Sequence, residues 1–212
     1  MRTRSSTLTL SALAILGATA LPVAAAGDTF TIDPSHSQVE FRIRHFVSKV
    51  PGRFGKYKGT ITADPNNLAS AVISVEIETA SINTDEAERD EHLRGPDFFD
   101  VAHFPKMTFV STQVVPKGSG KASMKGDLTL HGVTRPVDLD VDILGFMDGR
   151  GGIRAGFEAR GTINRKDFGM VWNRVLDTGG TILGDDVEIL LNIEASREKP
   201  KVEAKPAAGS NR

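Results

Sequence analysis

The chain has 212 residues, and its 26 Lys and Arg residues nearly balance its 27 Asp and Glu residues, giving a formal net charge of -1. This balance excludes the broad basic surface that nucleic-acid binding needs, so nucleic acid is not an expected partner. The sequence has no cysteine, which excludes disulfides, and its 11 Phe residues against one Trp and one Tyr predict an interior with few polar groups.

The N-terminal residues have the pattern of a secretory signal peptide. Two arginines precede an apolar stretch that ends in small residues, and Pro22 with the alanines after it favours cleavage over a spanning helix. We expect cleavage near Ala26, so that residues 1–26 are removed and residues 27–196 form the mature domain. Residues 197–212 combine charge, Pro and Ala without apolar periodicity, which predicts a disordered tail.

The body of the chain has the alternation of apolar and polar residues that is typical of β-strands. In residues 37–46, Val39, Phe41 and Ile43 alternate with polar residues, and His45 falls in the apolar phase. The same reasoning predicts further strands within residues 30–32, 57–63, 69–80, 106–112, 122–130, 136–144, 152–163 and 186–195. Long strands in a sheet of about eight favour closure, so we predict an all-β, antiparallel barrel whose interior is either filled by side chains or holds one small ligand.

One polar segment, residues 83–105, is too long for a hairpin connection. It predicts a short helical insertion that is capped by Asn83 or Thr84 and ends at Gly95. The pair Phe98–Phe99 after this helix is expected either to cover one mouth of the barrel as a lid or to fold under the barrel end.

No residue pattern predicts catalysis or a local metal site. The histidines show no metal-ligand spacing, and a site assembled from distant strands is less favoured than ordinary turn and loop hydrogen bonds; they are His36, His45, His92, His103 and His131. The sequence lacks a GxSxG nucleophile motif and a glycine loop that could bind phosphate. We therefore expect no metal, no cofactor and no catalytic residue.

Five segments follow one another along residues 28 to about 196: "FTIDPSHSQVEFRIRHF", "GRFGKYKGTI", "SINTDEAERDEHLRGPDFFDVAHFP", "LTLHGVTRPVDLDV" and "INRKDFGM". In this order they resemble the successive signatures of the YceI-like family of polyisoprenoid-binding, lipocalin-like proteins. The resemblance implies a lipocalin-like antiparallel β-barrel that holds an extended isoprenoid chain in an apolar lumen, commonly in the bacterial periplasm, without established catalysis.

With the ligand class implied by this resemblance, eight residues in the inward phase or near a mouth are predicted to contact the ligand. His45 is predicted to face the polar head, and the predicted tail contacts are Phe41, Ile43, Phe54, Phe98, Phe109, Phe168 and Trp172. For each of them, ordinary core packing is the competing interpretation.

The leading hypothesis is periplasmic binding, transport or storage of an isoprenoid lipid, either an isoprenoid quinone or a polyprenyl phosphate. The first alternative is a secreted enzyme that acts on such a lipid, suggested by the proximity in sequence of His92, Asp97, Asp100 and His103. The second is a non-catalytic, stress-related structural module whose barrel is solid. The lipid is the expected partner, and a homodimer stays open.

Overall fold

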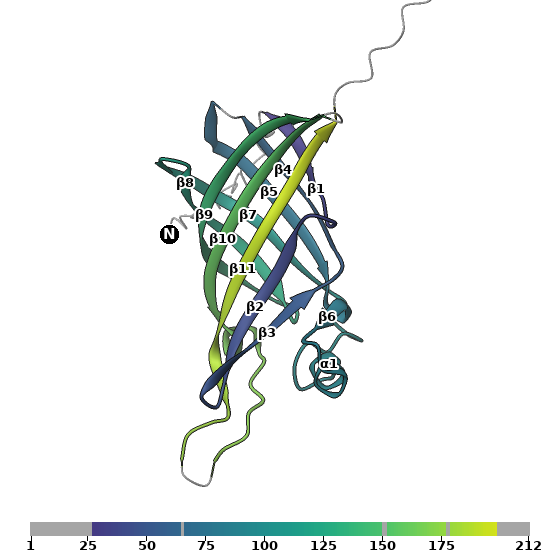
Figure 1. Ribbon diagram of the computed structural model, residues 1–212. Coiled ribbons are helices and arrows are strands. Elements are labelled where there is room, and N and C mark those ends of the chain that lie inside the picture. The colour runs from purple at the N-terminus through teal and green to yellow at the C-terminus, as the bar shows by residue number, and fades with distance from the viewer. Residues whose placement is uncertain (1–26, 65, 150–151, 177–178, 199–212) are drawn as a thin grey trace, which may run out of the picture.

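The structure is a computed structural model that describes residues 27–64, 66–149, 152–176 and 179–198 (Figure 1). The predicted signal peptide lies outside the described residues, and so does the predicted tail beyond Glu198. In the part of the chain that the structure describes, no helix is long and apolar enough to cross a membrane.

The described residues are almost entirely strands. In chain order the elements are β1 (Asp28–Ile32), β2 (Gln38–His45), β3 (Ser48–Phe54), β4 (Tyr57–Asp64), β5 (Asn67–Glu78), η1 (Thr79–Ser81), β6 (Ile82–Asn83), α1 (Ala87–Arg94), β7 (Lys106–Gly118), β8 (Lys121–Leu130), β9 (Val133–Gly149), β10 (Gly152–Asn164), η2 (Arg165–Phe168) and β11 (Leu183–Glu198). The strands follow the alternation in the sequence, because residues of one phase face the barrel interior and residues of the other face water.

Eight of these strands form a closed antiparallel barrel. Around the ring the order is β1–β4–β5–β7–β8–β9–β10–β11, and β11 closes the ring by pairing with β1 at Thr31↔Ser196 and Ile32↔Ala195 (Figure 1). Because the ring is closed, each of these eight strands is paired on both sides. The predicted all-β antiparallel barrel with a short helical insertion is confirmed.

Two further strands extend the wall at one end of the ring. β2 pairs with the first half of β11, from His45↔Leu183 to Gln38↔Asn192, and β3 pairs with β2 and then with the short β6. Figure 1 shows the β2–β3 hairpin, α1 and the long connection between η2 and β11 at this same end. We call it the helix end, and we call the end where β9 turns into β10 the far end.

The alternation rule did not predict β3. Its sequence, "SKVPGRF", contains Pro51 and Gly52, which usually interrupt strands. β3 pairs along its length with β2 and meets β6 only at Arg53 and Phe54. Pro51 therefore lies on an edge strand, where the N–H group that proline lacks is not needed for a second partner.

The helical insertion exists, but its predicted N-cap is wrong. The cap is Glu86, whose carboxylate accepts the backbone N–H groups of Glu88 and Arg89, rather than Asn83 or Thr84. Thr84 instead donates its hydroxyl to the buried carboxylate of Asp90 at 2.6 Å. The helix ends at Gly95 as predicted.

Candidate ligand-binding cavity

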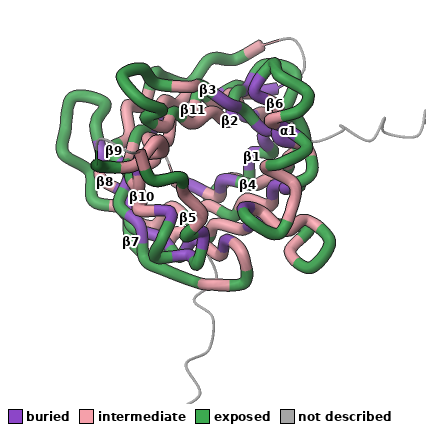
Figure 2. Tube along the Cα trace, turned by 90° about the horizontal axis from the view of Figure 1, so that it is seen from below, coloured by how far each residue is buried: buried purple, intermediate pink, exposed green. Residues whose placement is uncertain are grey.

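The barrel encloses a cavity of about 740 Å³, within the range of about 300 to 1,000 Å³ that is usual for small-molecule sites. Its wall includes Leu183 at the start of β11 and Ile193 ten residues further along, so the cavity follows more than half of that strand. Figure 2 views the same wall end-on, with α1 beside one side of the ring. The cavity favours a hollow lumen over the solid-barrel alternative.

The polar groups of the cavity are concentrated at the helix end. Among the described residues, the charged or titratable side chains of the lining, apart from Tyr57, are Glu40, His45, Glu86, Glu88, Arg89, His92, Arg165 and Arg174. Toward the far end the lining is apolar, with Leu68, Val114, Phe146 and Phe157. An elongated ligand with one polar end would therefore place its apolar part toward the far end and its head at the helix end.

Two lining phenylalanines lie over glycines of neighbouring strands. A Cβ built on Gly52 would lie 2.2 Å from Cζ of Phe41, and one built on Gly126 would lie 2.3 Å from Cζ of Phe109. Each ring tip thus occupies the space that a side chain on the facing strand would fill. Because the rings rest on the wall in this way, they leave room in the middle of the barrel.

Three aromatic rings join α1 and its following segment to the connection after η2. The ring centroids of His92 and Trp172 lie 5.0 Å apart, those of Phe98 and Trp172 lie 5.2 Å apart, and those of His92 and Phe98 lie 5.1 Å apart. Phe99 meets Phe54 edge-on at 5.6 Å. The pair Phe98–Phe99 thus packs at the helix end, where Phe98 is buried and both rings line the cavity, a placement that fits either expected arrangement.

Arg165, which the sequence analysis did not select, organises this end of the cavity. Its side chain is 3% exposed, and its guanidinium donates to the carbonyls of Gly184 (2.9 Å), Met170 (2.5 Å) and Trp172 (2.8 Å) and pairs with Asp185 (3.1 Å). Burial lowers its pKa, and the nearby carboxylate opposes this shift. The arginine therefore fixes the Trp172 segment against the start of β11. Its only sequence signal was its place inside "INRKDFGM".

Seven of the eight residues predicted to contact ligand line the cavity: Phe41, Ile43, His45, Phe54, Phe98, Phe109 and Trp172. Phe168 is the exception, because it is 1% exposed and packs in the core with Leu130 and Met170 rather than in the lining. The pattern around Phe168 predicted contact with the ligand, but in η2 its ring is enclosed by other core residues and is not part of the lining. Ligand contact by the seven residues stays a prediction.

The four residues that suggested an enzyme do not converge on the cavity. His92 Nε2 lies 3.0 Å from Asp97 Oδ2, and His103 Nδ1 lies 2.8 Å from Asp100 Oδ2, so they form two separate local pairs. Of the four, only His92 contributes to the lining.

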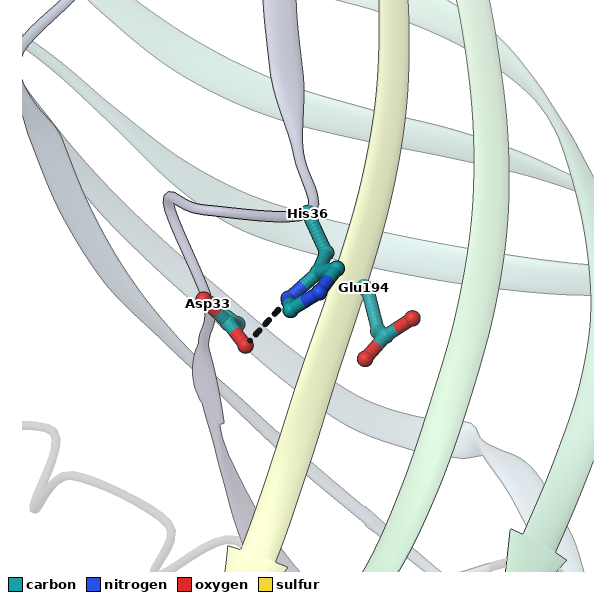
Figure 3. Close-up of side chains that lie close together, drawn as sticks. All are labelled: Asp33, His36 and Glu194. Atoms are coloured by element: carbon teal, nitrogen blue, oxygen red, sulfur yellow. Dashed lines mark hydrogen bonds and ion pairs between the residues drawn. The ribbon is translucent and has the colours of Figure 1, made fainter.

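Three potential metal ligands gather outside the cavity. Figure 3 shows Asp33 and His36, on the connection after β1, beside Glu194 of β11, and their ligand atoms lie within 4.8 Å of one another. Arg154 contacts both carboxylates, including Asp33 Oδ2 at 3.4 Å, so a guanidinium already supplies the positive charge between them. We interpret the group as an ion-pair network on the outer face of the barrel.

Residues 30–195 match the YceI-like domain. The chain is 44% identical over 166 residues to a UPF0312 protein of Yersinia pseudotuberculosis serotype O:1b, an alignment that covers 77% of this chain and 83% of that protein. It is 39% identical over 166 residues to a UPF0312 protein of Vibrio cholerae serotype O1, with 76% of this chain and 88% of that protein covered.

Solved structures are similar over the same region. BcnA of Burkholderia cenocepacia superposes with a TM-score of 0.70 at 25% identity, covering 78% of this chain and 99% of that one. The YCEI protein of Campylobacter jejuni gives 0.64 at 33% identity, covering 72% and 88%. A polyisoprenoid binding domain from Saccharophagus degradans, implicated in plant cell wall breakdown, gives 0.59 at 17% identity over 79% and 97%, which shows a shared fold. The matched domain and these relatives together show that the chain belongs to the YceI-like family.

Proposed function

We propose that this protein binds an isoprenoid lipid in the barrel cavity and carries or stores it without chemical conversion. The observation that carries the proposal is the distribution of polarity in the cavity: among the described residues, the lining toward the far end is apolar and the charged groups lie at the helix end. A long apolar chain with one polar head matches this distribution. The fold shared with a polyisoprenoid binding domain supports the same ligand class.

The head group is proposed to be a quinone or a phosphate. His45 and Arg174 line the cavity at the helix end, and both side chains can donate hydrogen bonds to a quinone carbonyl or to phosphate oxygens. Arg165 is less suited to this role, because its guanidinium is already bonded to three carbonyls and to Asp185.

We also propose that the protein works in the periplasm after removal of residues 1–26, from the signal pattern in the sequence. N-terminal sequencing of protein purified from the periplasmic fraction should begin close to Gly27. Recovery of Met1 on the folded, functional protein would contradict export by this route.

The binding proposal is tested with an isoprenoid quinone as probe and the fluorescence of Trp172, the single tryptophan, as readout. Ala71 lines the cavity, whereas Ala69 on the same strand is exposed and does not. Ala71→Phe should therefore weaken quinone binding by about tenfold or more, since it fills lumen space that the ligand needs. Ala69→Phe is the matched control and should bind like the wild type.

Thermal unfolding of the same variants separates a hollow lumen from a packed one. Enlarging a residue in a packed core costs about 1 to 3 kcal/mol, whereas a phenylalanine that enters free space costs less. Retained stability with lost binding supports the proposal. A wild type that binds no quinone and no polyprenyl phosphate would end it.

A further inference from the structure

The turn between β2 and β3 carries two apolar residues at the tip of the molecule. His45 pairs with Ser48, so Phe46 and Val47 form a two-residue hairpin loop. Such loops favour Asn and Gly because they need positive φ, yet Phe46 adopts φ 51° here. Val47 is fully exposed and Phe46 is 46% exposed. The turn therefore combines an unfavourable backbone conformation with unburied apolar side chains, a combination that folding alone does not explain.

The connection after η2 adds an exposed apolar residue beside this turn. Val175 is largely exposed and pairs with Thr181. The two segments are joined, since the backbone N–H of Phe46 donates to the carbonyl of Ile182 at 2.8 Å and the backbone N–H of Ile182 donates to the carbonyl of Arg174. We call Phe46, Val47 and Val175 the apolar tip.

Basic residues accompany the apolar tip. Residues 41–54 contain four Arg and Lys residues and no Asp or Glu. Lys49 and Arg53 pair with carboxylates of other segments. Within the described part of the chain, Arg42, Arg44 and Arg174 form no ion pair, and Arg44 donates only to the neutral carbonyl of Phe46. The carboxylate of Asp185 lies close enough to Arg44 to interact with it electrostatically, but it is already bonded to Arg165 and Lys166. This side of the helix end therefore keeps positive charge beside the exposed apolar side chains.

We propose that the apolar tip docks on the surface of a lipid bilayer that contains anionic lipids, with the helix end of the cavity facing that bilayer. Apolar side chains that enter the interface and basic side chains that meet anionic headgroups are the two contributions that hold proteins at membrane surfaces. Arg174 and His45 belong to the cavity lining next to the tip, so docking brings the polar end of the cavity to the bilayer. A lipid could then pass between bilayer and cavity without crossing water.

The transfer of a lipid through the helix end rests on the proposed function. The docking itself depends only on the exposed apolar and basic side chains of the helix end. The carboxylates of Glu86 and Glu88 lie on the α1 side of the same end, so the hairpin side is the one that an anionic bilayer favours.

The far end provides a matched control surface. Leu144 and Met147 are exposed there, on β9. Residues 138–149 contain four aspartates and neither Lys nor Arg, and three of these aspartates pair with Lys117, Lys121 and Lys125 of neighbouring strands. The positive charge beside this exposed apolar surface is therefore offset by carboxylates. Replacing exposed apolar side chains at each of the two ends therefore distinguishes docking through the apolar tip from nonspecific hydrophobic adsorption to the vesicles.

The test is flotation with vesicles of phosphatidylglycerol and phosphatidylethanolamine, compared with vesicles of phosphatidylcholine alone. The wild type should bind the anionic vesicles, and the double variant Phe46→Ser with Val47→Ser should bind them about tenfold more weakly or worse. Leu144→Ser with Met147→Ser should bind like the wild type. Arg44→Gln with Arg174→Gln should also weaken binding and should reduce its dependence on salt.

Quinone titration in solution accompanies each variant. The single variant Val47→Ser should keep its quinone affinity, since Val47 does not line the cavity. The double variant should still bind quinone, with at most a small loss, because the Phe46 ring lies outside the lining but packs edge-on against His45 at 4.9 Å between ring centroids. If the wild type floats but binds no quinone, docking stands and the carrier function fails. If quinone binds but the wild type fails to float, or the far-end variant loses as much binding as the tip variant, the docking proposal is overturned. It is also overturned if the tip instead joins two copies, seen as a dimer that the tip variant abolishes without any vesicle binding.

Discussion

At the scale of single residues, the hollow interior depends on where phenylalanine rings are placed. Phe41 faces inward from β2, but the glycine opposite it on β3 lets the ring tip lie against the wall. The sequence alternation predicts the direction of Phe41 and not the position of its ring, because that position depends on a residue of another strand. Gly52 thus matters for the cavity through the side chain that it lacks.

The substitution Gly52→Ala should shrink the cavity with little loss of stability. The new Cβ would meet the Phe41 ring at 2.2 Å, and the ring, as the free end of a side chain, must swing toward the lumen. An altered rotamer costs about 1 kcal/mol, whereas quinone affinity should fall several-fold. Gly55→Ala is the control, since its Cβ would meet only Ser81 at 3.8 Å. Unchanged quinone affinity in Gly52→Ala would show that Phe41 does not limit the lumen.

The outer ion-pair network makes a separate prediction about pH. The hydrogen bond with His36, followed by that from the backbone N–H of Ser35, lowers the pKa of Asp33 to about 2. A carboxyl whose pKa is lower in the folded state than in the unfolded state stabilises the fold. This stabilisation is fully present when the pH is above the unfolded pKa of about 3.9, and it is lost as the pH falls toward 2.

The variant Asp33→Asn should therefore be less stable than the wild type at pH 7, and the difference should shrink as the pH falls from about 4 to about 2. Urea midpoints of both proteins across this range provide the measurement. If the difference in stability grew on acidification, the pKa of Asp33 would not be lowered in the folded state.

At the scale of elements, strands that alternate strictly were predictable and irregular ones were not. The alternation along β2, β8 and β11 predicted those strands because the period of two fixes a buried face. β3 was missed because Pro51 and Gly52 hide its pattern, although both fit an edge strand that faces a large ring. The polar end of the cavity was only partly predicted, since α1, η2 and the connection to β11 meet through tertiary contacts that no local pattern encodes.

Arg165 connects these elements, and its replacement tests that role. Arg165→Met should leave the carbonyls of Met170, Trp172 and Gly184 without their donor and should cost about 3 kcal/mol of unfolding free energy. Arg160→Met on the neighbouring strand is the control and should cost less than about 0.5 kcal/mol, because Arg160 is exposed and forms only a surface ion pair. Equal urea midpoints for the two variants would show that Arg165 does not hold these elements together.

At the scale of the whole molecule, the barrel has an apolar space that a ligand can fill. The described wall is closed around the ring, the lumen is apolar toward the far end, and the charged groups of the lining lie at the helix end. A ligand that binds only the folded state stabilises it, and the free energy gained grows with the logarithm of the ratio of ligand concentration to dissociation constant. The protein should therefore melt at a higher temperature when an isoprenoid quinone is added.

Native mass spectrometry of the protein, purified without detergent from the cells that produce it, tests the central claim most directly. We predict one isoprenoid lipid bound per chain in the wild type and in Ala69→Phe, and loss of that lipid in Ala71→Phe. A wild type that carries no lipid, and acquires none from added quinone or polyprenyl phosphate, would contradict the account.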